Sequence, residues 1–184
     1  MAQTPNPTLE QYWSMAALVD GRVSVALREL ARRLEDNLPG LIGYANGELG
    51  YSGENEIRQP AFYKSAPVGL EDGPLNGILI GATTETEFQG SGQFRNIYQV
   101  SVLSIDERIE TQEQYHRAWD RLGLIRVALF PFTGGCVDDV GRVCWRSLVP
   151  QQGGVEEESW QEYGGLYAHY SMVCEPSQNI WSVN

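Results

Sequence analysis

The fold is decided by two neighbouring stretches, NIYQVSVLSI at residues 96–105 and QEQYHRAWDRLGLIRVAL at residues 112–129. In the first stretch apolar residues alternate with polar ones, and Tyr98, Val100 and Val102 share one face. Successive side chains of a strand point to opposite faces, so this alternation predicts a strand with one buried face.

The second stretch has the period of an α-helix. Thr111 followed by Gln114 matches a capping box at its start, and Pro131 is expected to stop it. The apolar residues recur at three or four positions and predict one buried stripe, formed by Tyr115, Trp119, Leu122, Ile125 and Leu129.

An earlier helix is predicted from about Gly21 to Leu38. Asp20 is its expected N-cap, and Pro39-Gly40 is its expected end. Its buried stripe consists of Val23, Leu27, Leu30, Leu34 and Leu38. A long polar loop is expected to follow over residues 43–59.

These elements, with the remaining strands, predict an α+β fold. We expect a mainly antiparallel sheet of about five strands, with two long helices packed on one face and a short N-terminal helix. We expect the chain to consist of three parts: an N-terminal extension at 1–19 that contains the short helix, an α+β domain at 20–175 and a C-terminal tail at 176–184. The strands are expected at residues 61–66, 77–84, 94–105, 142–149 and 163–174.

The charge balance argues against a protein that grips nucleic acid. The chain has 184 residues, 13 of them basic and 24 acidic, for a formal net charge of −11. Proteins that bind phosphate backbones do so with Lys and Arg, which release counterions. The acidic balance has two interpretations: it keeps the protein soluble, or it forms a surface past which DNA slides without binding.

We find no motif that predicts catalysis, a cofactor or a metal site. The two histidines, His116 and His169, lack neighbouring ligands at zinc-site spacing and are interpreted as a solvated helix residue and a sheet-face residue. The cysteines Cys136, Cys144 and Cys174 are expected to be thiols, although the first two have a spacing that a hairpin disulfide would also give. We therefore expect no enzyme; a small hydrolase that uses one of these cysteines remains the alternative.

Three aromatic residues lie outside the periodic core pattern: Phe88 at a predicted hairpin tip, Trp160 in an acidic linker and Trp181 in the tail. Large apolar residues on loops are natural anchors of subunit and partner contacts. The other interpretation is that each folds back onto its own domain.

The element order resembles that of the tail terminator proteins of tailed bacteriophages. The resemblance rests on an early amphipathic helix (VSVALRELARRLEDNLPGL), a strand with aromatic residues (AFYKS), a long central strand and the helix after it, and two final strands (RVCWRSLVP and YGGLYAHYSMVCE). It covers residues 20–175; residues 1–19 and the loop at 43–59 depart from it. Related ring-forming neck and tail-completion proteins have similar element orders.

The resemblance implies a structural virion protein that forms a ring, usually a homo-hexamer, at the head-proximal end of the tail tube. Its partners would be the tail-tube protein and the neck or connector proteins, and DNA would pass through the channel without specific binding. The protein would be assembled in the host cytoplasm and located in the virion, with no membrane contact. A third hypothesis is a generic binding domain that recognises a partner strand at a sheet edge.

Overall fold

The computed structural model describes residues 9–65, 76–88, 94–106, 109–139, 141, 143–155 and 165–174, with the side chains of 9–22, 84–88 and 94–96 left out. The elements in chain order are α1 (Leu9–Leu49), η1 (Gly53–Asn55), β1 (Tyr63–Lys64), β2 (Asn76–Phe88), β3 (Phe94–Asp106), α2 (Gln112–Leu129), η2 (Phe130–Phe132), β4 (Cys136–Val137), β5 (Val143–Trp145), β6 (Ser147–Val155) and β7 (Gly165–Val173). The fold is α+β, as the sequence predicted.

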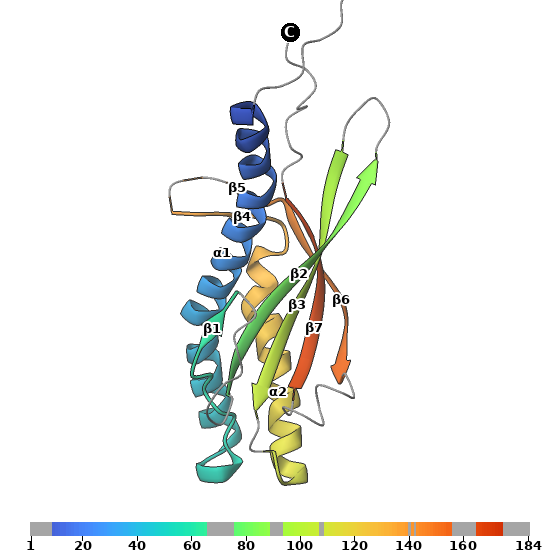
Figure 1. The fold of residues 1–184 in the computed structure, drawn as a ribbon. Coiled ribbons are helices and arrows are strands. Elements are labelled where there is room, and N and C mark those ends of the chain that lie inside the picture. Colours follow the sequence, from blue (N-terminus) through green and yellow to red (C-terminus); the bar gives the residue numbers. More distant parts are fainter. Residues whose placement is uncertain are drawn as a thin grey trace, which may run out of the picture.

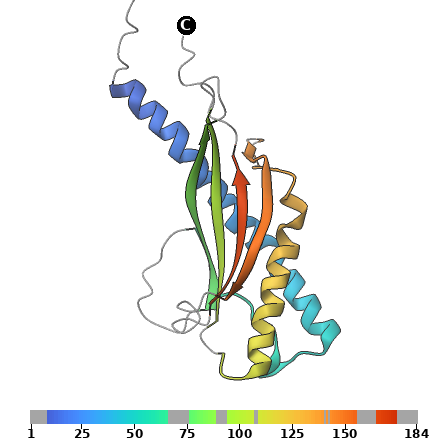
Figure 2. The same cartoon turned by 90° about the vertical axis from the view of Figure 1, so that its right-hand side faces the viewer.

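The main sheet has five strands in the order β1-β2-β3-β7-β6. Three of its pairings are antiparallel, but β1 runs parallel to β2, so the sheet is mixed rather than mainly antiparallel as expected. Backbone hydrogen bonds hold this parallel pair: the Ala61 N–H donates to the Asn76 carbonyl at 2.8 Å, and the Ile78 N–H donates to the Phe62 carbonyl at 2.9 Å. Figures 1 and 2 show both helices on the same side of this sheet.

The core lies between the helices and one face of the sheet. The alternation that predicted β3 is confirmed, because Tyr98, Val100 and Val102 are buried while the residues between them are partly exposed. The same alternation holds along β7, where Leu166, Ala168, Tyr170 and Met172 are buried. One face of the sheet is therefore covered by the helices, and among the described residues no helix packs on the other, which we call the open face.

Helix α1 is continuous from Leu9 to Leu49, which corrects three expectations. The separate short N-terminal helix, the N-cap at Asp20 and the helix end at Pro39-Gly40 are all wrong. Proline inside a helix removes one hydrogen bond and costs about 3 kcal/mol. Burial offsets this cost here, because the stripe continues through the proline and its members are fully buried: Leu30, Leu34, Leu38 and Ile42.

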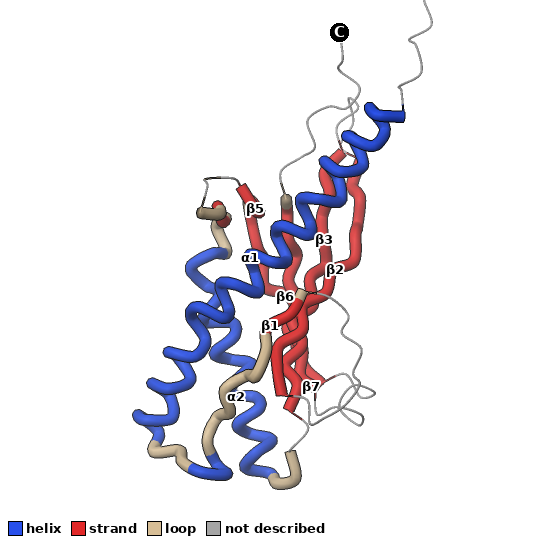
Figure 3. Tube along the Cα trace, turned by 60° about the vertical axis from the view of Figure 1, so that its left-hand side comes forward, coloured by secondary structure: helices blue, strands red, loops and turns tan. Residues whose placement is uncertain are grey.

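The segment after α1 is tied to the helix rather than forming a loop from residue 43. The Asn46 side chain accepts a 2.8 Å hydrogen bond from the Ile57 N–H and donates a 3.0 Å bond to the Ile57 carbonyl. The Ile57 side chain is buried in the core. These contacts hold residues 50–59 against the end of α1, as the traces of Figure 3 show.

Helix α2 begins as predicted. Thr111 accepts a hydrogen bond from the Gln114 N–H, and the Gln114 side chain bonds back to the Thr111 N–H, which completes the capping box. The predicted stripe is partly wrong: Trp119 is 36% exposed and Tyr115 is half-buried. The inner face is formed instead by Ala118, Arg121, Leu122, Ile125, Ala128 and Leu129.

Strands β2 and β3 form a long hairpin that extends past the rest of the sheet. They pair over their whole length, from Asn76↔Asp106 to Phe88↔Phe94. Strand β7 pairs with β3 only over Ile97–Ile105, so the end where β2 leads into β3 projects beyond β7 and β6 (Figure 1). Strand β2 therefore continues past its expected end at residue 84 to Phe88, which was expected at the hairpin tip.

Candidate functional site

The open face of the main sheet is the first candidate surface. On it, Ser101 of β3 and His169 of β7 are directly opposite, and the serine Oγ lies 3.0 Å from the histidine Nδ1. The rings of Tyr167 and His169 meet edge to face with centroids 4.3 Å apart. The hydrogen bond and the ring contact fix the imidazole on the sheet, so this face presents preorganised polar and aromatic groups.

The strands that carry this face contain no charged residue over most of their length. Residues 77–83, 97–105, 147–155 and 165–173 include no Asp, Glu, Lys or Arg, whereas a fifth of the whole chain is charged. Lys64 of β1, in register with Leu79, borders the face. Depletion of charge is typical of the core of a protein interface.

The outer side of α2 is the second candidate surface. Trp119, Gly123, Val127 and Phe130 follow one another at spacings of four, four and three residues, on the side opposite the core stripe. Val127 is 54% exposed and Phe130 is 74% exposed. Exposed large apolar residues that line up on one helix face mark an interaction site more often than isolated ones do. We call these four residues the outer stripe of α2, although the last of them, Phe130, is the first residue of η2.

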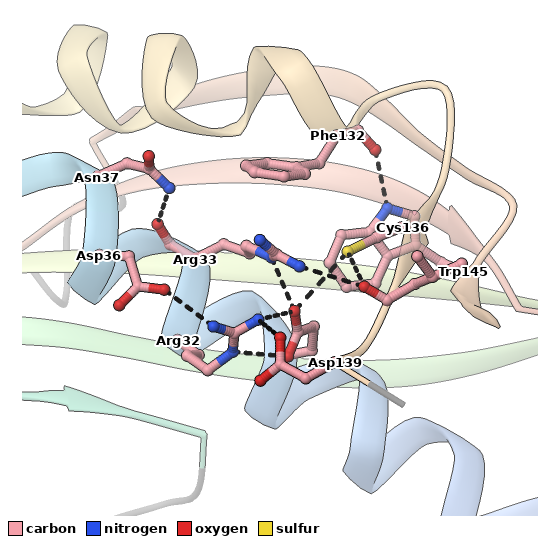
Figure 4. A network of polar contacts seen from close by, with 10 residues as sticks. Arg32, Arg33, Asp36, Asn37, Phe132, Cys136, Asp139 and Trp145 are labelled. Carbon is pink, nitrogen blue, oxygen red and sulfur yellow. Dashed lines mark hydrogen bonds and ion pairs between the residues drawn. The ribbon is translucent and has the colours of Figure 1, made fainter. Parts of the chain in front are cut away.

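A polar cluster joins α1 to the two-stranded sheet formed by β4 and β5 (Figure 4). The Glu29 carboxylate, 7% exposed, accepts hydrogen bonds from Arg33 Nε at 2.7 Å and from Arg32 at 2.8 Å. Arg32 also reaches Asp139 at 3.1 Å, and Arg33 donates to the Val137 carbonyl at 3.2 Å. The Arg33 guanidinium lies over the Phe132 ring. The backbone carbonyl of Phe132 accepts a hydrogen bond from the Trp145 indole N–H.

The electrostatics of this cluster point to a structural role. The hydrogen bond from Arg32 lowers the pKa of Glu29 despite its burial. The Cys136 thiol lies 3.9 Å from the Glu29 carboxylate, and burial raises the pKa of that thiol. A thiol with a raised pKa is a weak nucleophile at neutral pH. The cluster therefore holds the β4–β5 hairpin against α1.

A second buried network surrounds Arg121 of α2, which is 1% exposed. Its guanidinium donates to Ser104 Oγ at 2.8 Å, to Asn76 Oδ1 at 2.7 Å and to the Ile105 carbonyl at 2.6 Å. Burial lowers the pKa of Arg121 to about 10, so the group is still charged at neutral pH. The network fastens α2 to the start of β2 and to the end of β3.

Of the three residues expected at partner contacts, only Phe88 lies in the described part of the chain. Phe88 is the last residue of β2, at the projecting end of the hairpin, and is in register with Phe94; its side chain is not among those described. Trp160 and Trp181 lie outside the described residues.

The cysteines and histidines all fall within the described part of the chain. Cys136, Cys144 and Cys174 are buried thiols without a disulfide. His116 is exposed on α2, as predicted, and His169 lies on the open sheet face. Over the described ranges, no group of three or more His, Cys, Asp or Glu is placed to hold a metal ion.

No helix in the described residues is long and apolar enough to cross a bilayer.

Comparison with known families and with curated proteins adds no relative. No family model matches this sequence. No curated protein matches it either.

The outer stripe of α2 is the feature that the sequence interpretation missed. Trp119 was assigned to the buried side because its spacing from Leu122 and Tyr115 suits a helix stripe. The sequence also contains the pattern of this outer stripe, because Trp119, Gly123 and Val127 are spaced four residues apart and lie on the opposite side of the helix from Ile125.

Proposed function

We propose that this chain is a structural virion protein that forms a ring at the end of a phage tail tube and joins the tube to the head–neck. The observation that carries the proposal is the element order: a long helix, a long hairpin, a capped helix and two closing strands in one α+β domain. This is the order on which the resemblance to tail terminator proteins rests. The ring would be a homo-hexamer, with the tail-tube and neck proteins as its neighbours.

Two surface properties support an assembly role. The open sheet face has no charged residue over most of its strands, and the outer stripe of α2 consists of uncharged residues with Asp120 and Arg126 beside them, on a chain of net charge −11. The hairpin of β2 and β3 projects past the other strands, as Figure 1 shows, and offers backbone groups and the Phe88 position to a neighbour.

The acidic balance fits a channel that DNA crosses. A ring of acidic subunits repels the phosphate backbone, so the DNA passes without specific binding. The same balance keeps unassembled subunits apart in the host cytoplasm until they meet the tail tube.

The proposal is tested by removing the gene from its phage and imaging the particles. We expect tails of irregular length and heads without attached tails, and we expect the purified protein to decorate one end of isolated tail tubes in negative stain. Normal tails joined to heads in the deletion strain would contradict the proposal. As a control, restoring the gene in trans should restore tail length.

A further inference from the structure

The hairpin of β4 and β5 contains two of the three cysteines. Val137 of β4 is directly opposite Val143 of β5, and their inner neighbours along the two strands are Cys136 and Cys144. Val137 and Val143 are 51% and 41% exposed, whereas Cys136 and Cys144 are 7% and 3% exposed. Successive side chains of a strand point to opposite faces, so the two thiols share the buried face of the hairpin.

A β-bulge sets the position of the two cysteines relative to each other. The register shifts between Cys136 and Val137, and Cys136 is opposite Trp145 rather than Cys144. Cys144 is therefore the extra residue of the bulge and lies diagonally across from Cys136. Neighbouring strands lie about 5 Å apart, which corresponds to the separation of roughly 4.4–6.8 Å between Cα atoms that a disulfide requires.

The turn between the two strands is already formed while the cysteines are thiols. The Gly141 N–H donates a 3.0 Å hydrogen bond to the Asp138 carbonyl, and Gly141 has a φ of +81°, a value that favours glycine. A bond between Cys136 and Cys144 therefore needs no new path for the chain. The third cysteine, Cys174, follows β7 in the main sheet and is not part of this hairpin.

The closed hairpin protects its thiols. The Cys136 thiol donates to the Glu29 carboxylate at 3.9 Å, and burial raises the pKa of this thiol. Thiol–disulfide exchange requires a thiolate that the other reactant can reach. The hairpin must therefore move away from α1 before its cysteines react, and the ion pair of Arg32 with Asp139, at 3.1 Å, is one contact that opposes this movement.

We propose that Cys136 and Cys144 are the two halves of a disulfide that forms when the protein passes from a reducing to an oxidising environment. The oxidant is a low-molecular-weight disulfide such as glutathione disulfide. One cysteine thiolate attacks it, forms a mixed disulfide and releases one glutathione thiolate; the second cysteine thiolate then displaces the other. Two protein thiols are oxidised, one disulfide is reduced to two thiols, and the two protein protons pass to the released thiolates.

The biological setting of this step rests on the proposed function. A virion protein is assembled in the host cytoplasm and is then released into the medium. Thiols stay reduced in the cytoplasm, whereas disulfides form and persist outside the cell. The bond then ties β4 to β5 in the released particle.

The first test maps the disulfides of the purified full chain. The wild type is incubated with excess glutathione disulfide, alkylated without reductant and digested with trypsin, which cleaves at Arg142 between the two cysteines. We expect mass spectrometry to find the Cys136 peptide joined to the Cys144 peptide, and Cys174 as a thiol. Three unpaired thiols, a bond through Cys174 or a persistent mixed disulfide with glutathione would overturn the proposal.

The second test compares the thermal midpoints of the oxidised and reduced protein. Oxidation should raise the midpoint by ~5 °C or more, because the bond restricts the unfolded chain. Cys144→Ser should abolish this shift. Cys174→Ser, which removes the other buried thiol, is the matched control and should retain it. A shift that survives in Cys144→Ser and disappears in Cys174→Ser would overturn the assigned pairing.

The third test examines the route by which the thiols become accessible. Asp139 and Asp36 each pair with Arg32 at 3.1 Å, but only Asp139 lies between β4 and β5. Asp139→Asn should raise the rate of disulfide formation about two- to fivefold, and Asp36→Asn should leave it unchanged. Equal rates in the two variants would overturn movement of the hairpin as the route.

The disulfide and the proposed function fail separately. No bond in the purified chain, together with irregular tails in the deletion strain, would reject the disulfide and leave the function standing. A bond between Cys136 and Cys144 in the purified chain, together with normal tails in the deletion strain, would reject the function and leave the disulfide standing.

Discussion

The guanidinium of Arg121 donates a 2.7 Å hydrogen bond to the side-chain oxygen of Asn76, across 45 positions of sequence and inside the core. Arg121 also bonds Ser104 and the Ile105 carbonyl, so a single side chain of α2 joins the beginning of β2 to the end of β3. Beside it, Arg58 and Asp106 form an ion pair. This network sets the position of α2 on the sheet, and hence the direction in which the outer stripe faces.

Replacing Arg121 by Met should be strongly destabilising. The change removes the Arg121 donors from three buried acceptors, at about 1–3 kcal/mol each, so we expect the free energy of unfolding to fall by ~3 kcal/mol or more. Urea denaturation measures the loss. Arg28→Met, on the exposed side of α1, is the control and should change stability by less than about 0.5 kcal/mol. Equal effects of the two substitutions would show that the network does not stabilise the fold.

Glu29 should make stability depend on acid pH. Its pKa lies below the ordinary 4.5 because Arg32 hydrogen-bonds the carboxylate, so the ionised form is favoured by folding. The resulting stabilisation is fully present above pH 4.5 and is lost as the pH falls through the lowered pKa. Glu29→Gln should cost about 1–3 kcal/mol at pH 7 and should have a smaller loss between pH 7 and pH 3 than the wild type.

The control for this measurement is Glu35→Gln, an exposed residue of the same helix. Its urea midpoints at the two pH values should follow those of the wild type. A pH dependence that is identical in the wild type and in Glu29→Gln would contradict the role assigned to the buried carboxylate.

The three cysteines should react slowly in the native protein. All are buried, and burial raises the pKa of Cys136 in particular. Because the thiolate is the reactive form, we expect alkylation at pH 7 to be at least about a hundredfold slower in the folded protein than in urea. The reaction is followed by mass spectrometry of each cysteine peptide. One cysteine that reacts rapidly in the folded state would favour the alternative of a cysteine enzyme.

Pro39→Ala should stabilise the protein. Pro39 is exposed in the interior of α1, where it removes a backbone hydrogen bond that alanine would restore. The greater freedom of the unfolded chain offsets part of this gain, so we expect a net increase of ~1–2 kcal/mol in the free energy of unfolding. Gly40→Ala, where an added Cβ meets nothing within 4 Å, provides the comparison and should give about 0.5–1 kcal/mol. A loss of stability in Pro39→Ala would argue that the proline fixes a bend that the fold requires.

The sequence by itself determined the elements whose signals are local. The alternation around Val100 predicted β3, the capping box at Thr111 predicted the start of α2, and the spacing of Leu30, Leu34 and Leu38 predicted the central part of α1. Each signal arises from residues within one or two turns, or within one strand, so no distant partner is needed to detect it.

Only the tertiary structure decided the features that depend on distant partners. Helix α1 continues through Pro39 because Leu38 and Ile42 are buried in the core, and a local rule that penalises proline does not include that burial. The parallel pairing of β1 with β2, the burial of Arg121 and the exposure of Trp119 likewise follow from contacts between separate elements. The free energy gained by burying an apolar side chain exceeds most differences in helix propensity between residues. The sequence therefore predicted the elements, whereas packing decided which surfaces remain exposed.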